Sequence, residues 1–536
     1  MGALFGGDDG RQTAGLGTLG GYRDSDTLIV GRASDARSLD PARPSDFESA
    51  EVIMQVFDRL VHYEPGSNQP MPGLATSWTQ ENAGRSWVFE LRRGVTFHDG
   101  TPFNADAVVL SVERQLDPGH RHHVDDFFYW KHYFANVEAI EKLDEYRVRI
   151  DIERTFAPFL ANMSIFSMGI ISPTALEKYG ADIATHPVGT GPFRFASWDN
   201  GRVVLERNPS YWGGPSRFRR LVFETVEDPR QRLTALESGA IDIALNVPPE
   251  ERQFIQLHPR LQLYETKANS VTYLAMNTRR PPFHDVRVRR AVNYSINKGP
   301  IVQVLWHGLA KPAHTPVPPS QWGHYQVPEP YDYDPEGARR LLDEATADGV
   351  LDPQKVYKLL VPSTSRLYLP SPERLGRAIQ ANLEDVGLNV EVIAQPYDKH
   401  DEAVQSGAHD LCVDGWVGDT GDPDNFLYLL LAGANADPDS GAASNLAFFD
   451  DGEVDGMLTY AQEAMDQRSR ERDYARVQRL VHELAPWVPL AHSTTGIAAR
   501  GDIENVRMSI SGLIQYRDAY RRADGAVRRT PRAAPP

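Results

Sequence analysis

The sequence is poor in the features that mark several classes of protein. It holds one cysteine, Cys412, among 536 residues, so neither an internal disulfide nor a zinc site built from several cysteines can form. It has no run of about 18 apolar residues, which predicts that no helix spans a membrane. Basic residues are in the minority, 56 against 73 acidic ones, and the net charge is −17. This balance disfavours nucleic acid or an anionic membrane as the main partner.

The two ends of the chain lack the periodicity of folded segments. Residues 1–26 contain eight glycines and no apolar central region, so we expect a disordered segment and no targeting segment in this chain. Gly15, Gly17 and Gly20 match the dinucleotide-binding fingerprint, but they lack the strand before and the helix after that this fingerprint requires. Residues 521–536 contain five arginines and three prolines, and we expect a disordered tail there.

Between these ends, short apolar strands alternate with helices of about 10 to 15 residues, the pattern of α/β proteins with mixed sheets flanked by helices. The length exceeds one ordinary hydrophobic core, which predicts two lobes or more. The main expected strands are 27–30, 87–91, 146–152, 203–205, 221–223, 241–244, 271–276, 356–361 and 390–393. The main expected helices are 48–61, 105–116 (with Asn104 as its N-cap), 230–238, 286–296, 335–345 and 372–386.

Several short motifs follow one another in a fixed order over most of the chain. Each motif is weak alone, but together they resemble the solute-binding proteins of ABC importers over about residues 26–520. The resemblance is to the peptide/nickel-binding family, and most of all to its dipeptide-binding branch. The motifs are 75–78, 87–105, 189–193, 208–214, 276–278, 285–294 and 333–336.

This resemblance implies a bilobed clamp like that of periplasmic binding proteins, with an additional subdomain inserted in the first lobe. The chain would cross between the lobes near 267–270 and near 491–493. Lobe I would comprise 27–58, 189–269 and 492–520, the inserted subdomain 59–188, and lobe II 270–491.

The resemblance also implies a site for a peptide with free termini. Asp419, in the motif 415–426, would receive the α-amino group, and Arg366 would hold the α-carboxylate. A buried zwitterion needs a countercharge at each end, which a carboxylate and a guanidinium supply. The further ligand-binding residues that it implies are Gly415, Trp416, Val417 and Gly418, with Ser45 and Asp46 lending backbone contacts.

Other polar clusters predict less specific roles. Asp422 and Asp424 lie in a loop rich in glycine and proline, where aspartate usually caps turns. His120, His122 and His123 crowd together and resemble metal ligands, but they follow a loop start, so we predict a solvated loop and no metal site. The aromatic run 127–130 predicts packing within the inserted subdomain.

These observations predict an extracytoplasmic binding protein that delivers short peptides, above all dipeptides, to the permease subunits of an ABC importer. We expect a monomer without cofactor, metal, nucleic-acid partner or catalytic step, in the periplasm or lipid-anchored at the outer face of the cell membrane. The same fold could take an oligopeptide, a nickel chelate, haem or an oligosaccharide instead. A secreted peptidase is the alternative from another class, and the sequence shows no nucleophile-elbow or zincin motif for it.

Overall fold

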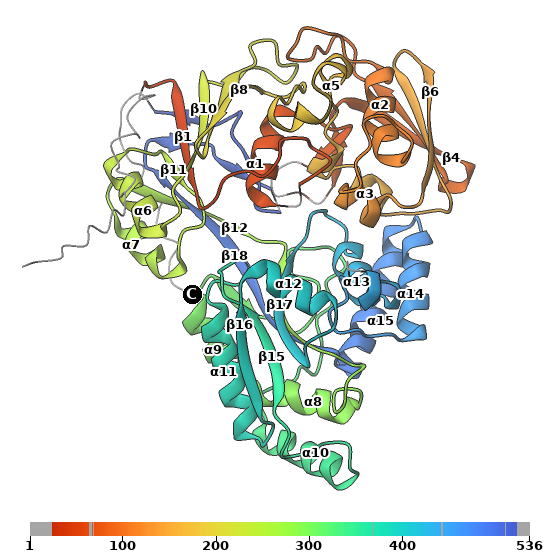
Figure 1. Ribbon diagram of the computed structural model, residues 1–536, viewed down its shortest axis with the longest axis vertical. Coiled ribbons are helices and arrows are strands. Elements are labelled where there is room, and N and C mark those ends of the chain that lie inside the picture. The colour runs from red at the N-terminus through yellow and green to blue at the C-terminus, as the bar shows by residue number, and fades with distance from the viewer. Residues whose placement is uncertain are drawn as a thin grey trace, which may run out of the picture.

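The chain folds into two lobes that share one sheet (Figure 1). The computed structural model describes residues 24–522, except 45, 64–66, 68, 367, 441–442 and 510. Within these residues a twelve-stranded mixed sheet runs in the order β16-β15-β17-β13-β18-β11-β1-β10-β9-β8, and β12 and β14 also pair with β18. The predicted α/β fold with mixed sheets is confirmed. The strands of this sheet are β1 Thr27–Arg32, β8 Phe193–Asp199, β9 Arg202–Arg207, β10 Arg220–Thr225, β11 Ile243–Ala244, β12 Leu261–Lys267, β13 Ser270–Met276, β14 Ala310–Pro312, β15 Tyr357–Pro362, β16 Val390–Gln395, β17 Leu411–Val417 and β18 Trp487–Arg500.

We call the half of the molecule with β1 and β8–β11 the upper lobe and the half with β13 and β15–β17 the lower lobe, as they lie in Figure 1. A separate four-stranded antiparallel sheet, β4-β5-β7-β6, lies in the upper lobe, between α1 and β8 in the sequence. Its strands are β4 Ala75–Glu81, β5 Ser86–Leu91, β6 Val137–Asp144 and β7 Arg147–Ile152. The extent of an inserted subdomain over 59–188 stays a prediction. Three short pairs complete the strands: β2 Val61–Tyr63 with β3 Pro70–Pro72, β19 Ile503–Glu504 with β22 Tyr520–Arg521, and β20 Arg507–Met508 with β21 Ile514–Gln515.

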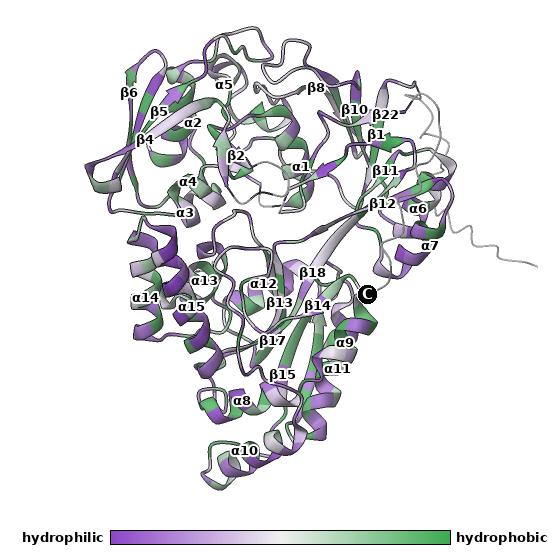
Figure 2. Ribbon diagram, turned by 180° about the vertical axis from the view of Figure 1, so that it is seen from behind, coloured by the Kyte–Doolittle hydropathy of each residue, from purple (hydrophilic) through white to green (hydrophobic). Residues whose placement is uncertain are grey.

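The helices cover the sheets, and local sequence signals determine where several of them begin. Asn104, Asp334 and Asp466 each accept a backbone N–H in the first turn of the helix that they precede, as N-cap residues do. Figure 2 shows that α14 and α15 consist mostly of hydrophilic residues, whereas strand β15 is mostly hydrophobic. The α-helices are α1 Phe47–Val56, α2 Ala105–Leu116, α3 Phe128–Tyr133, α4 Phe159–Asn162, α5 Pro173–Tyr179, α6 Pro229–Ser238, α7 Arg252–Leu257, α8 Val286–Ser295, α9 Lys298–Leu305, α10 Pro335–Ala347, α11 Pro372–Asp385, α12 Tyr397–Gln405, α13 Asp424–Leu431, α14 Gly452–Glu463 and α15 Gln467–Leu484. None of these helices, within the residues described, is long and apolar enough to cross a membrane.

One long strand, β18, belongs to both lobes. Its first residues pair with β13 up to Ala491, and from Thr494 onward it pairs with β12. Two residues, Ala268 and Asn269, separate β12 from β13. The chain therefore runs from β12 into β13 at 268–269 and changes partner along β18 near 492–493 (Figure 1), while the predicted bounds of the lobes stay a prediction.

The predicted helix over 48–61 is wrong at its C-terminal end, because α1 stops at Val56. The loop around Gly189 and Gly191 packs against that end, and the Gly191 N–H donates to the Val56 carbonyl at 2.9 Å. A Cβ at Gly189 would lie 2.2 Å from the same carbonyl oxygen. Tertiary packing by a distant glycine loop thus ends the helix, and the apolar residues after Val56 continue as a buried extended segment.

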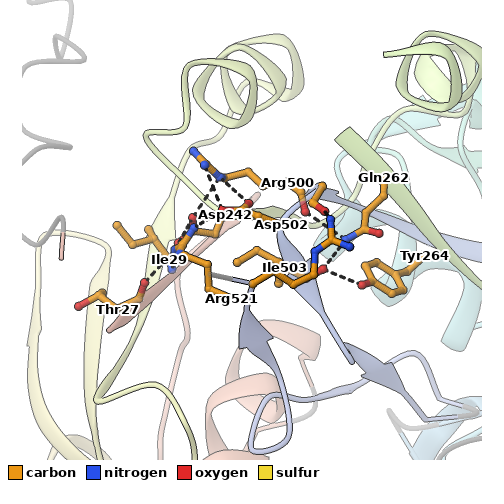
Figure 3. Close-up of polar contacts among 11 residues, drawn as sticks. Thr27, Ile29, Asp242, Gln262, Tyr264, Arg500, Asp502, Ile503 and Arg521 are labelled. Carbon is orange, nitrogen blue, oxygen red and sulfur yellow. Dashed lines mark hydrogen bonds and ion pairs between the residues drawn. The ribbon is translucent and has the colours of Figure 1, made fainter. Parts of the chain in front are cut away.

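The C-terminal segment is fastened to the upper lobe by a buried aspartate. Figure 3 shows Asp242 between Arg500 and Arg521, and its Oδ1 accepts from Arg521 Nη2 at 2.9 Å. Both arginines also bind Asp502, at 3.1 Å each. The described chain thus continues in strand β22 past the predicted boundary at 520, whereas residues 1–23 and 523–536, where we predict disorder, lie outside the described residues.

Candidate functional site

A small cavity lies between the end of β17 and the upper lobe. Its volume is about 40 Å³, and because roughly 10–15 Å³ by this measure holds one water, a side-chain carboxylate would fit. Asp419 lines it from the lower lobe. The other lining residues, from the upper lobe, are Met54, Arg59, Tyr63, Ser164, Ile165, Phe166, Ser509, Ser511, Leu513 and Gln515.

The Asp419 carboxylate is held from the upper lobe, and the Asp419 backbone is held from the lower lobe. Tyr133 donates its hydroxyl to Oδ2 at 3.0 Å, and Tyr129 donates to Oδ1 at 3.3 Å. From the lower lobe, Asn425 accepts the Asp419 N–H and donates to the Tyr133 hydroxyl. Loss of solvent raises the pKa of Asp419 to about 6, although the two tyrosine hydroxyls oppose this shift. The carboxylate is therefore ionised at neutral pH and placed to receive a cation.

The two tyrosines carry a role that the sequence interpretation misses. Tyr129 lies in the aromatic run for which we predict packing within the upper lobe, and it does pack against Phe166. Its hydroxyl nevertheless reaches across to Asp419, as does that of Tyr133 from the next turn of α3. An aromatic ring with a polar tip can pack and bind at once.

Strand β17 presents part of one edge without a neighbouring strand. It pairs with β13 along its whole length, but β15 pairs only with its first two residues. The Gly418 N–H donates to the Asn269 carbonyl at the end of the β13 side. Because successive residues turn their backbone groups to opposite edges, those of Gly415 and Val417 face away from β13. An extended peptide could pair there.

Glycine at position 415 is required by a close approach. A Cβ there would lie 2.3 Å from the Tyr368 ring. Tyr368 donates its hydroxyl to Asp414 Oδ1, which also accepts the Gly415 N–H at 2.7 Å. The neighbouring Trp416 donates its indole N–H to Asn425 at 2.9 Å, which holds the ring of Trp416 beside the Asp419 loop.

Arg366 lies in the lower lobe, and its guanidinium carbon is 3.3 Å from the centre of the Tyr397 ring. Among the described residues it forms no ion pair, and its buried Nε has no hydrogen-bond partner. Arg366 is two residues from Tyr368, which packs on Gly415, whereas Asp419 follows the far end of β17. Asp419 therefore follows the last residue of the free edge of β17, and the segment that carries Arg366 meets this edge at Gly415.

The family assignment follows from comparison with known sequences. Residues 69–438 match the family model described as "Bacterial extracellular solute-binding proteins, family 5 Middle". The chain belongs to this family. The match covers more than half of the chain, so the predicted resemblance to extracytoplasmic solute-binding proteins is confirmed.

Relatives and solved structures in this family agree with the fold. The chain is 33% identical to Heme-binding protein A of Haemophilus influenzae over 82% of each sequence. It is also 33% identical to Di/tripeptide-binding protein 2 of Pseudomonas aeruginosa, over 90% of this chain and 92% of that protein. Its structure resembles the periplasmic binding protein DppA of Helicobacter pylori in complex with peptide STSA. That match has a TM-score of 0.82 and 28% identity, and it covers 92% of this chain and 98% of the other.

The N-terminal residues predicted to contact ligand are placed only in part. Ser45 lies outside the described residues. Asp46 is the N-cap of α1, where one carboxylate oxygen accepts the Ser49 N–H at 2.8 Å and the other is buried without a partner. The cap explains the side chain of Asp46, and a backbone contact to ligand stays a prediction.

Asp422 and Asp424 do more than cap turns, the role that we predict for them. Asp422 does accept the Asp424 N–H, but it also forms a buried, two-pronged ion pair with Arg470 of α15, at 2.7 Å for each bond. Asp424 accepts from Gln462 at 3.2 Å, and burial raises its pKa to about 7. This network fixes the loop that carries Asp419 to the helices behind it.

The histidine loop is held by contacts to its surroundings. The ring of His123 bonds to the Arg114 carbonyl at 3.0 Å, and that of His122 lies 4.0 Å from the Glu177 carboxylate. In the part of the chain that the structure describes, no three His, Cys, Asp or Glu side chains converge in a way that could hold a metal ion.

The hairpin β20–β21 forms one wall of the cavity and is fastened by α1. The fully buried Glu51 accepts from the Ile514 N–H at 3.0 Å and from the Tyr516 hydroxyl at 3.2 Å. Gln55 donates to the Ile514 carbonyl at 2.8 Å. Burial raises the pKa of Glu51 to about 8, so this side chain keeps its proton at neutral pH.

Replacing Glu51 by glutamine should flatten the dependence of stability on pH. The folded-state pKa lies above the ordinary 4.5, so the free energy of unfolding falls as pH rises from about 4.5 to about 8. Glutamine cannot ionise. The melting temperature of Glu51→Gln relative to that of the wild type should therefore be several degrees higher near pH 9 than near pH 5. The control is Glu344→Gln at an exposed position, which should change the melting temperature by the same amount at both pH values. Equal changes for Glu51→Gln at both pH values would contradict a buried, protonated Glu51.

Proposed function

We propose that this protein captures short peptides, above all dipeptides, between its lobes and delivers them to the membrane subunits of an ABC importer. The observation that carries this proposal is the half-buried, ionised Asp419 at one end of a free strand edge. An α-ammonium group would displace the tyrosine hydroxyls or share the carboxylate with them. Charge-assisted hydrogen bonds of this kind are about twice as strong as neutral ones.

The rest of the peptide would follow the free edge of β17. Its backbone would pair with the Gly415 carbonyl and with Val417, because the Gly415 N–H is already bonded to Asp414. Trp416 beside them would provide an apolar wall. Its α-carboxylate would meet Arg366, which already has one face on Tyr397 and retains free donors. Pairing through the backbone accepts many side chains. Relatives named for di/tripeptide binding and a neighbour solved with peptide STSA support this ligand class.

Closure of the lobes would signal that the site is occupied. Asp419 and Arg366 belong to the lower lobe, whereas Tyr129 and Tyr133 belong to the upper one, so a ligand at Asp419 touches both. Such a ligand stabilises the closed form by its differential contacts. We propose a monomer outside the cytoplasm that works without a catalytic step.

Haem is the second candidate ligand, because a relative of 33% identity is named Heme-binding protein A. Native mass spectrometry of the purified protein, followed by denaturing release, separates the two. We expect a bound mass that resolves into dipeptides. A haem mass, with the visible absorption of a porphyrin, would support the second candidate, and an intact non-peptide ligand of any other kind would overturn the first.

A further inference from the structure

Arg59 is a buried cation that lacks an anionic partner. Only 8% of its surface is exposed. Its Nη1 lies against the sulfur of Met54, and its buried Nε has no hydrogen-bond partner. A thioether is a weak acceptor and carries no charge. Within the described residues Arg59 forms no ion pair; burial lowers its pKa, and the negative charge of the neighbouring Asp58 opposes this shift.

The carboxylate next to Arg59 in sequence is engaged elsewhere. Asp58 accepts from the Tyr211 hydroxyl at 2.9 Å, from the Thr190 hydroxyl at 2.8 Å and from the Trp212 indole N–H at 2.8 Å. These three donors occupy both of its oxygens. Asp58 therefore attracts Arg59 only from a distance. Burying a guanidinium without an anion in direct contact is costly, so the place of Arg59 in the wall of a cavity points to a ligand.

Arg59 lines the same small cavity as Asp419. In the proposed pose, the α-amino group lies on Asp419 and the peptide backbone leaves along β17 toward Arg366. The side chain of the first peptide residue is then the ligand group nearest to Asp419 that can enter the cavity. A cavity of about 40 Å³ accepts a group of a few heavy atoms.

We propose that Arg59 binds the acidic side chain of the first residue, so that the protein prefers peptides that begin with aspartate or glutamate. This inference rests on the proposed function and names its preferred ligands. A guanidinium can grip a carboxylate with two parallel bonds. The N-terminal residue would then be held by opposite charges, its ammonium by Asp419 and its side chain by Arg59.

Titration calorimetry with three dipeptides tests this preference on the unmodified protein. Asp-Ala should bind at least about tenfold more tightly than Asn-Ala, which has the same shape without the charge, and more tightly than Ala-Ala. Equal affinity for Asp-Ala and Asn-Ala would overturn the role of Arg59 while leaving dipeptide binding in place. Failure of all three to bind would overturn the proposed function and this inference with it.

A variant then assigns the preference to Arg59. Arg59→Met replaces the guanidinium by an unbranched apolar chain beside Met54 and should bring the ratio of the Asp-Ala and Asn-Ala affinities close to one. The exposed Arg121→Met should keep the wild-type ratio. Because the ratio compares two ligands on one folded sample, a loss of stability does not imitate the result. A ratio that persists in Arg59→Met would overturn the assignment.

Discussion

Replacing Asp419 by asparagine should weaken dipeptide binding by about 30-fold or more, because removing one partner of a buried charge pair costs about 2–5 kcal/mol and 1.4 kcal/mol is tenfold. Asparagine keeps the shape of the side chain and an acceptor for Tyr133 or Tyr129, so the change isolates the charge. Titration calorimetry measures the loss, and thermal unfolding checks that the variant folds. The exposed Asp439→Asn, in the same segment of the lower lobe, should bind as the wild type does.

The same carboxylate should make binding depend on pH. Its pKa is about 6, so above that pH it is ionised and below it the countercharge for an ammonium disappears. Affinity for a dipeptide should therefore fall between about pH 7.5 and about pH 5, and this fall should be absent in Asp419→Asn. Wild-type affinity in Asp419→Asn, or an equal pH slope in both proteins, would refute the ammonium site at this position.

Replacing Arg470 by alanine should lower the free energy of unfolding by about 3–5 kcal/mol, the usual cost of leaving one member of a buried ion pair alone. The side chains of Arg470 and Asp422 are only 6% and 7% exposed. Without the guanidinium, Asp422 is left charged beside Asp424, whose pKa is already raised to about 7. Denaturant unfolding followed by circular dichroism measures the loss.

The control for this prediction is an ion pair at the surface. Lys399 and Glu402 lie 2.8 Å apart with both side chains 71% exposed, where solvent screens the attraction. Lys399→Ala should leave unfolding unchanged within error. If Arg470→Ala destabilises the protein no more than Lys399→Ala does, the network behind the Asp419 loop does not contribute to stability as we infer.

The parts of the fold that depend on local signals are predictable from the sequence. The helix over 105–116 is an example, since its boundaries follow from Asn104 and from the apolar spacing. The prediction of a helix over 48–61 is wrong at its C-terminal end because a contact distant in sequence, and no local signal, ends the helix. Its apolar spacing continues past Val56, but a loop at 189–191 ends it by packing, and no local pattern reports that contact.

The residues of the candidate site are likewise predictable only in part. Asp419 and Arg366 could be named because they lie in motifs with a family resemblance. The tyrosines that hold Asp419 are 286 and 290 residues away in sequence, and an aromatic run predicts packing more readily than a polar contact. Arg59 lies within the helix predicted over 48–61, where a charged residue is usually exposed to solvent. Its place in the wall of the cavity, which marks it as a candidate for binding, is visible only in the structure.

Strand β18 also determines when the protein can fold during its synthesis. It lies between β13 of one lobe and β11 of the other, yet it is made from residues 487–500. Until those residues have left the ribosome, the inner edges of β13 and β11 have no partner, and unpaired edges invite pairing with other chains. Neither lobe can complete its sheet before nearly the whole chain is available, so we expect the final fold to form only at the end of translation.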